Sequence, residues 1–219
     1  GVTYLCNGAV SGSWWKGAHH RCQPGYAMLD LFDDGTFTNT YATYGWKAVG
    51  TLLPEAGAKL DPRREAWVAA INGVWGEHLA KTGNPLAIAM KLRHDGKALA
   101  LEAPALREAF GTGRGRLALL LHGLCMNDLQ WLRQGHHHGR MLADKLGFVP
   151  LYLNYNSGRH VSENGRELAA LLQGLIDAWP EPVEELVLVG HSMGGLVARS
   201  ACHYAELEKL AWRRKLKRI

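Results

Sequence analysis

The chain has 219 residues, a formal net charge of +5 and 47% hydrophobic residues, so its length allows one domain with a small appendage. Five cations near the end account for the whole net charge, and this argues against a nucleic-acid-binding body: Arg213, Arg214, Lys215, Lys217 and Arg218. We expect these cations instead to lie near the C-terminus of a helix, where positive charge interacts favourably with the helix dipole. The sequence contains no apolar run of about 18 residues, so it predicts no transmembrane helix.

Residues 1–49 are rich in glycine and aromatic residues. Two alternating stretches, residues 25–32 and 36–41, flank Asp33-Asp34-Gly35 and predict a β-hairpin. The run Asn-Gly-Ala-Val-Ser-Gly-Ser-Trp-Trp at residues 7–15 resembles the β region that follows the catalytic core of calcineurin-like metallophosphoesterases. That family binds two metals through Asp, His and Asn ligands upstream of this region. The resemblance therefore implies a tail without a metal site, and we expect the His19-His20 pair to be solvated.

The next segments predict a linker and the start of a second domain. Residues 50–63, with Pro54, Gly57 and Pro62, are the predicted linker, and residues 64–219 the larger domain. Residues 62–80 predict a helix with one apolar face made of Trp67, Ala70, Ile71 and Val74. Residues 86–92 and 97–102 predict two edge strands joined by a turn at residues 94–96.

Strands and helices then alternate, which predicts an α/β fold with a mostly parallel sheet. The glycine-rich run 111–115 precedes a strand, whereas a dinucleotide-binding loop follows one. Residues 117–121 predict a buried strand, residues 127–146 a helix that ends at Gly147, and residues 148–155 a further strand. Asn164 and Glu167 have the spacing of a helix N-cap. Leu168, Leu171, Leu172, Leu175 and Ile176 form the apolar face of that helix, which ends at Trp179-Pro180.

The stretch from Leu186 to Val197 is the most informative part of the chain. A run typical of a strand buried on both faces leads into Gly190-His191-Ser192-Met193-Gly194, and a helical pattern follows at once. This is the G-x-S-x-G nucleophile elbow between strand and helix, where a strained turn exposes the serine hydroxyl. We expect Gly190, Gly194 and Gly195 to allow strand and helix to approach closely. The pattern predicts Ser192 as a nucleophile.

The buried strand that ends in His122-Gly123, together with this elbow, resembles the α/β-hydrolase superfamily and especially its lipases and esterases. The resemblance implies an oxyanion hole made by the backbone N–H groups of Leu124 and Met193. Residues 154–160 and 164–167 also resemble a bacterial group of lipase-like hydrolases, so the likeness covers about residues 64–212. It implies hydrolysis of carboxylic esters or lipids through an acyl-enzyme, with no cofactor or metal.

The other members of a catalytic triad are missing from the expected places. In this fold the acid and the histidine follow the serine, but the residues after Ser192 contain no Asp and only His203, Glu206 and Glu208 as candidates. At about 1.5 Å per helical residue, His203 lies roughly 16 Å from Ser192. We therefore expect the chain to be truncated after the elbow, as an internal fragment or a joined reading frame. Alone it should be inactive, with its end inside a helix and its elbow strand unpaired on one side.

Three alternatives stay open: an acyltransferase on the same fold, a fragment of a calcineurin-like metallophosphoesterase, and a non-catalytic hydrolase relic. The cysteines Cys6, Cys22, Cys125 and Cys202 lack C-x-x-C spacing, so we expect no zinc site. We expect Cys125, in the oxyanion loop, and Cys202, on a buried helix face, to be free thiols, and the protein to be cytoplasmic. We interpret His136-His137-His138 as a surface run rather than a metal site. Oligomeric state has no signal in the sequence.

Overall fold

The computed structural model describes residues 25–31, 37–43, 62–133 and 135–219, which fall into two compact units, Gly1–Thr51 and Leu52–Ile219. In the first unit, β1 (Gly25–Leu31) pairs antiparallel with β2 (Phe37–Thr43), with Leu31 opposite Phe37. This confirms the predicted hairpin. The run at residues 7–15 and the His19-His20 pair lie outside the described residues.

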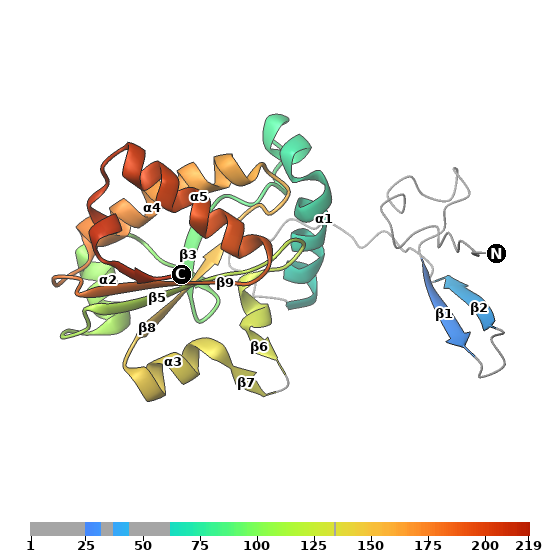
Figure 1. The fold of residues 1–219 in the computed structure, drawn as a ribbon, viewed down its shortest axis with the longest axis horizontal. Helices are drawn as coiled ribbons and strands as arrows, with labels where there is room; N and C mark the ends of the chain where they lie inside the picture. The colour runs from blue at the N-terminus through green and yellow to red at the C-terminus, as the bar shows by residue number, and fades with distance from the viewer. Residues whose placement is uncertain (1–24, 32–36, 44–61, 134) are drawn as a thin grey trace. The chain divides into compact units, whose positions relative to one another are not determined.

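The second unit is built on a six-stranded sheet of order β10-β9-β5-β8-β3-β4 (Figure 1). Its strands are β3 (Lys91–His94), β4 (Lys97–Ala98), β5 (Arg116–Leu121), β8 (Val149–Asn154), β9 (Glu185–Gly190) and β10 (Leu216–Arg218). The pairs from β10 to β8 are parallel, and those of β3 with β8 and β4 are antiparallel. The fold is therefore α/β with a mostly parallel mixed sheet, as the sequence predicts.

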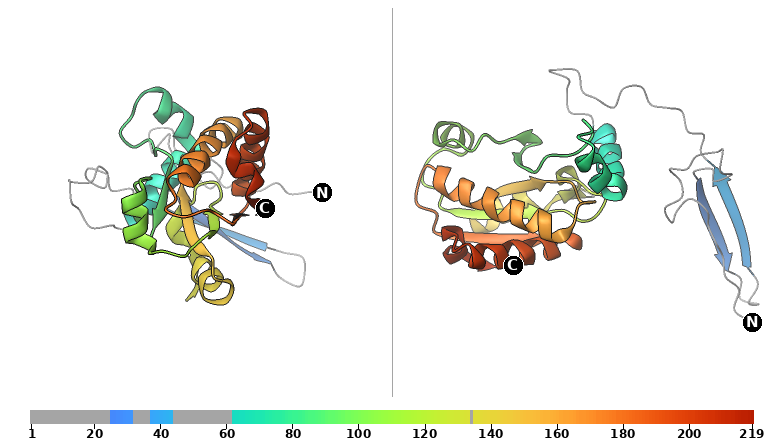
Figure 2. Two further views of the ribbon diagram at one scale, coloured as in Figure 1. Left: turned by 90° about the vertical axis from the view of Figure 1, so that its left-hand side faces the viewer. Right: turned by 90° about the horizontal axis from the view of Figure 1, so that it is seen from above.

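Five α-helices are described, and three of them cover the two faces of the sheet. They are α1 (Pro62–Lys81), α2 (Ala103–Phe110), α3 (His138–Leu146), α4 (Val161–Ala178) and α5 (Met193–Leu207). Helices α4 and α5 lie side by side on one face, and α3 lies on the other (Figures 1 and 2). Among the described residues, no helix is both long and apolar enough to cross a membrane.

The chain changes direction across the sheet between β5 and β9. It leaves β5 through α3 to reach β8 on one side, and it leaves β9 through α5 to reach β10 on the other. Connections between parallel strands are right-handed, so this reversal places α3 and α5 on opposite faces. Ligands of open α/β sheets bind outside the carboxyl ends of the strands at such a reversal. The topology thus points to the ends of β5 and β9.

The core explains why the two strands differ in burial. Residues Leu117 to Leu121 of β5 are all buried because helices cover both faces of this central strand. In β9 only Leu186 and Leu188 are buried, while Val187 and Val189 are partly exposed. The prediction that β9 is buried on both faces is therefore wrong, since β9 lies near the edge of the sheet and is well covered only by the α4–α5 layer.

The helix predicted over residues 127–146 is interrupted. A 3₁₀ turn, η3 (Asp128–Trp131), is followed by a small hairpin of β6 (Leu132–Arg133) and β7 (His136–His137) before α3 begins. Gly135, with a φ of 78°, supplies the left-handed residue in this hairpin. The predicted end at Gly147 is confirmed, because this residue adopts a φ of 69° at the C-cap of α3.

Side-chain hydrogen bonds explain two further corrections. Asn164 lies inside α4, which begins at Val161, and it is not an N-cap because its buried amide donates to the carbonyl of Asn156 at 2.9 Å. Residues 86–90 are not in a strand, since Asn72 of α1 bonds their backbone. Its Nδ2 donates to Leu86 O at 2.7 Å and its Oδ1 accepts from Ile88 N–H at 2.9 Å.

The buried face of α1 also differs from the predicted one. Ala69, Asn72, Gly76 and Leu79 are buried, whereas Trp67 and Val74 are each 40% exposed. Hydrophobicity alone predicts the wrong face because a hydrogen-bonding Asn and small residues let α1 approach its neighbours. A Cβ on Gly73 would lie 2.8 Å from Cys125 Cα, and one on Gly76 2.9 Å from Gly158 Cα.

The chain does not end inside the helix after the elbow. Helix α5 ends at Leu207, and a 3₁₀ turn, η4 (Ala211–Arg214), leads to β10. Strand β10 pairs with β9 at Leu216–Leu186 and Arg218–Val187, so the amino-terminal half of β9 has the neighbour that the sequence did not predict. Trp212 anchors this return, since its buried indole N–H donates to Ala169 O at 3.0 Å. Arg213 and Arg214 therefore lie in the last turn of η4, and Lys215 is its C-cap, whereas Lys217 and Arg218 belong to β10 and not to a helix end.

Candidate active site

The carboxyl ends of β5 and β9 lie next to each other in the sheet. Leu121 pairs with Gly190, and the His191 N–H donates to Leu121 O at 2.9 Å. The loop after β5 and the turn after β9 are thus held together at the point where the chain reverses direction. This is where the sequence predicts both the nucleophile and the oxyanion donors.

Ser192 occupies the turn between β9 and α5. It is exposed and has a φ of 52° and a ψ of −121°, a conformation that is costly for any residue other than glycine. Its carbonyl oxygen accepts from Gly195 N–H at 3.0 Å in the first turn of α5. The backbone therefore has the strain that the elbow pattern predicts, and the hydroxyl stands at a helix N-terminus that favours negative charge.

The close packing at this turn requires two glycines to lack a side chain, Gly190 and Gly194, but does not require this of Gly195. A Cβ on Gly190 would lie 2.5 Å from Gly195 N, and one on Gly194 would overlap Leu121 O and lie 2.7 Å from His122 O. Gly195 has nothing within 4 Å of the corresponding position. The prediction for Gly195 is therefore wrong in this respect: its backbone is approached by Gly190, but its own missing side chain leaves open space.

The two N–H groups predicted as oxyanion donors are available. Met193 is the first residue of α5, where backbone N–H groups lack partners within the helix. Leu124 is 51% exposed and follows Gly123 in the loop after β5. Within the described part of the chain, neither N–H donates a hydrogen bond. The contact of Gly194 with Leu121 and His122 brings the two segments together.

The loop after β5 is fixed from the loop after β8. Cys125 has a φ of 59°, and its N–H donates to the buried Ser157 hydroxyl at 3.0 Å. The Tyr155 hydroxyl donates to His122 O at 2.8 Å, and Met126 N–H donates to Gly123 O at 3.3 Å. Leu124 thus lies between two residues whose backbones are held in place. Sequence reasoning missed Tyr155 and Ser157, although both lie in the 154–160 motif that follows a strand.

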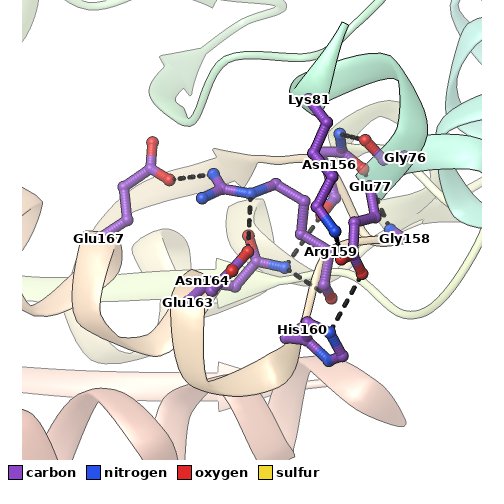
Figure 3. Close-up of polar contacts among 10 residues, drawn as sticks. All are labelled: Gly76, Glu77, Lys81, Asn156, Gly158, Arg159, His160, Glu163, Asn164 and Glu167. Carbon is purple, nitrogen blue, oxygen red and sulfur yellow. Dashed lines mark hydrogen bonds and ion pairs between the residues drawn. The ribbon is translucent and has the colours of Figure 1, made fainter.

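The same motif builds the polar network in Figure 3. Asn156 is 2% exposed, and its amide donates to Gly76 O of α1 at 2.8 Å while its Oδ1 accepts from Gly158 N–H at 3.1 Å. Asn164 of α4 donates to the Asn156 carbonyl. The buried amides therefore join α1, α4 and the loop after β8 behind the loop that carries Leu124.

Charged residues surround these amides on the outside (Figure 3). Arg159 forms ion pairs with Glu163 and Glu167 of α4, and His160 Nε2 lies 3.1 Å from Glu77 Oε2 of α1. A hydrogen bond from Lys81 lowers the pKa of the Glu77 carboxyl. Because water reaches these side chains, their ion pairs contribute little to the free energy of unfolding. We therefore infer that they mainly orient the loop after β8.

His122 is buried next to the candidate site. It is 1% exposed, stacks on Tyr155 with ring centroids 4.3 Å apart, and places Nδ1 2.9 Å from Gly123 O. Burial lowers its pKa from 6.5 to about 4, so the imidazole is neutral at physiological pH. The neutral imidazole of His122 therefore donates from Nδ1 to the Gly123 carbonyl and helps to hold the backbone after β5 in place.

This burial predicts a loss of stability in acid. Between pH 6.5 and about 4 the unfolded chain binds a proton at His122 that the folded protein does not, so stability falls as the pH falls through this range. The expected loss by pH 4 is about 3 kcal/mol in the free energy of unfolding, to be measured by urea denaturation at several pH values.

The control for this prediction uses two phenylalanine substitutions. His122→Phe keeps the stacking on Tyr155 but cannot titrate, so its stability should change less over this pH range. His203→Phe, at an exposed position of α5, should keep the wild-type dependence. An unchanged pH dependence in His122→Phe would contradict the assignment.

No described histidine follows Ser192 at a suitable place. His203 lies on α5 itself, eleven positions after the serine, and is exposed. His191 directly precedes the serine and lines a pocket of about 190 Å³ together with Met126, Asn127, Gln130, Trp131 and His138. Among the described residues, no group of three or more His, Cys, Asp or Glu could hold a metal ion. Cys125 and Cys202 are free thiols, as predicted.

Comparison with known proteins finds a family match over the part of the chain that contains the candidate site. Residues 113–213 match the model of the PGAP1-like alpha/beta domain. This domain is a member of the α/β-hydrolase superfamily. The PGAP1-like stretch contains β5, the loop with Leu124, the motif after β8 and the turn at Ser192, so it spans the whole candidate site. No match was found among curated proteins or among solved structures.

Proposed function

We propose that this protein is a serine hydrolase that acts on carboxylic esters or lipids through an acyl-enzyme. The observation that carries the proposal is the strained, exposed Ser192 between β9 and α5, next to the loop after β5. A turn of this kind directs a serine hydroxyl away from the sheet. The PGAP1-like match supports a hydrolase in general, and the ester specificity is our inference from the site.

In the proposed reaction, the Ser192 hydroxyl attacks the ester carbonyl, and its proton passes to a general base. The carbonyl oxygen becomes an oxyanion that accepts hydrogen bonds from the Leu124 and Met193 N–H groups. The alcohol then leaves with a proton, and water hydrolyses the acyl-enzyme to release the acid and free Ser192. The pocket beside His191, with Met126 and Trp131 in its lining, is our candidate for the acyl group.

We further propose that the triad histidine and acid are not among the residues that follow Ser192 here. His203 cannot reach the serine along one helix, and these residues contain no Asp. The separate β-rich segment at residues 1–49 also stays a proposal, supported by the β1–β2 hairpin.

Labelling with a fluorophosphonate tests the nucleophile. The probe forms a covalent bond with an activated serine, and intact-mass spectrometry counts the adducts. We expect slow labelling of the chain at one site, because no described histidine after Ser192 can reach its hydroxyl, and no labelling of Ser192→Ala.

Ser162→Ala, at an exposed serine of α4, is the matched control and should label as the wild type does. An adduct that persists in Ser192→Ala would overturn the assignment of the nucleophile. Rapid labelling with turnover of p-nitrophenyl esters would instead contradict the proposal that the residues after Ser192 lack the triad histidine and acid.

A further inference from the structure

A second pocket, of about 310 Å³, lies beside the amino-terminal half of β8 and does not include the residues of the candidate active site. Helix α3 packs against β8 on this side, opposite α4 and α5 (Figure 1). Its polar lining comes from separate segments: His94 at the end of β3, Asp95 in the turn to β4, Arg114 before β5, His137 and Arg140 around the start of α3, and Tyr152 of β8.

The pocket has an excess of positive charge. Arg114 and Arg140 lie 26 positions apart in the sequence but face one cavity, and within the described residues neither forms an ion pair. Asp95 is the only acid in the lining, and its carboxylate lies 3.6 Å from His94 Nε2 and is 84% exposed. Two guanidinium groups around one cavity repel each other, and a bound anion removes that repulsion.

Neutral side chains complete the lining. Burial raises the pKa of Tyr152 to about 12, so its hydroxyl stays protonated, and it lies 3.4 Å from His137 Nδ1. Burial lowers the pKa of His137, whose Nδ1 accepts from Arg140 N–H at 3.3 Å and leaves Nε2 as the donor. The lining therefore offers the guanidinium N–H groups of Arg114 and Arg140 and the Nε2–H of His137, and its one carboxylate, that of Asp95, is exposed.

The number of donors distinguishes between anions. One guanidinium fork contacts both oxygens of a carboxylate, whereas a phosphoryl group has three terminal oxygens, so a second arginine meets an oxygen that the first does not contact. We propose that this pocket binds the phosphoryl group of inorganic phosphate or of a phosphate monoester, through Arg114 and Arg140. The site also gives a role to the glycine-rich run 111–115, whose turns at Gly111 and Gly113 have φ values of 74° and 75° and precede Arg114.

Calorimetric titration of the full chain tests the site at neutral pH and low ionic strength. The probes are inorganic phosphate, phenyl phosphate and acetate. We expect saturable binding of phosphate to one site, at least about tenfold tighter than that of acetate. Arg114→Gln and Arg140→Gln should each weaken it by a factor of about 10 or more, the effect of losing a charged hydrogen-bonding partner.

The controls separate a built site from general charge. Arg199→Gln removes an exposed cation of α5 outside the pocket and should change the affinity less than twofold, as should Ser192→Ala. Both pocket arginines are exposed, so we expect the variants to fold, which their melting temperatures check.

Tighter binding of phenyl phosphate than of inorganic phosphate would identify a monoester whose organic part packs on Phe110 of the lining. Equal affinities would identify inorganic phosphate. Acetate binding as tightly as phosphate, no saturable binding, or an equal loss in Arg199→Gln would overturn the proposal. Because Ser192 takes no part, these results are independent of the proposed hydrolase function.

Discussion

Replacing Gly194 by alanine should lower the free energy of unfolding by about 3 kcal/mol, the cost of overpacking a tight contact. The new Cβ would overlap Leu121 O and lie 2.7 Å from His122 O, and both atoms belong to backbone at the end of the central strand β5. Backbone in the middle of a sheet cannot move aside as a flexible side chain can. We expect urea denaturation to show a lower midpoint with an unchanged slope.

Gly195→Ala is the matched control for this prediction. The two glycines are neighbours in the first turn of α5, but a Cβ on Gly195 meets nothing within 4 Å. Alanine favours the helix over glycine, so this variant should be as stable as the wild type or more stable by up to about 1 kcal/mol. Equal stabilities of the two variants would mean that α5 does not press against the end of β5 as the structure has it.

Asp128→Asn should destabilise the protein by about 3 kcal/mol, because it leaves a buried guanidinium with too little negative charge. The Arg93 side chain is 9% exposed, and its Nη1 bonds Asp128 Oδ1 at 3.0 Å and Glu65 Oε2 at 2.9 Å. The cluster joins α1, β3 and the η3 turn after β5. Thermal and urea unfolding of the variant measure the loss.

Two further variants decide whether burial is the cause. Lys81→Gln breaks the ion pair with Glu77, in which the lysine side chain is 72% exposed, and should cost far less stability than Asp128→Asn because solvent screens the pair. Replacing Arg93 by Met together with Asp128 by Leu removes both buried charges and should recover most of the stability. If Asp128→Asn costs no more than Lys81→Gln, the cluster is solvated and the assignment fails.

Both predictions concern the support of the candidate site. The missing side chain of Gly194 allows α5 to contact the end of β5. Asp128 lies four residues after Leu124 in the segment that follows β5. A variant that loosens either contact moves the segments that carry Ser192 and Leu124. Proposed catalysis depends on fixed positions for the hydroxyl and the two N–H groups, since donors must be in place before charge develops.

The sequence determined the features that depend on near neighbours. A continuous apolar run predicts β5. The G-x-S-x-G pattern between a strand and a helix predicts the strained turn at Ser192, between β9 and α5. Gly147 ends α3, and Asp33-Asp34-Gly35 separates the strands of the hairpin. In each case the decisive interactions are within a few residues, so the pattern of residue types is sufficient to predict them.

Only the tertiary structure decided which groups meet across the chain. Asn72 bonds the backbone of residues 86–88 and prevents a strand there, and Ser157 holds Cys125 from 32 positions away. Trp212 brings the end of the chain back to β9, which local periodicity could not indicate. The physical reason is that a buried polar group must find a partner, and the partner is set by which elements pack together. Arg114 and Arg140 likewise form one pocket only because the sheet places their segments side by side.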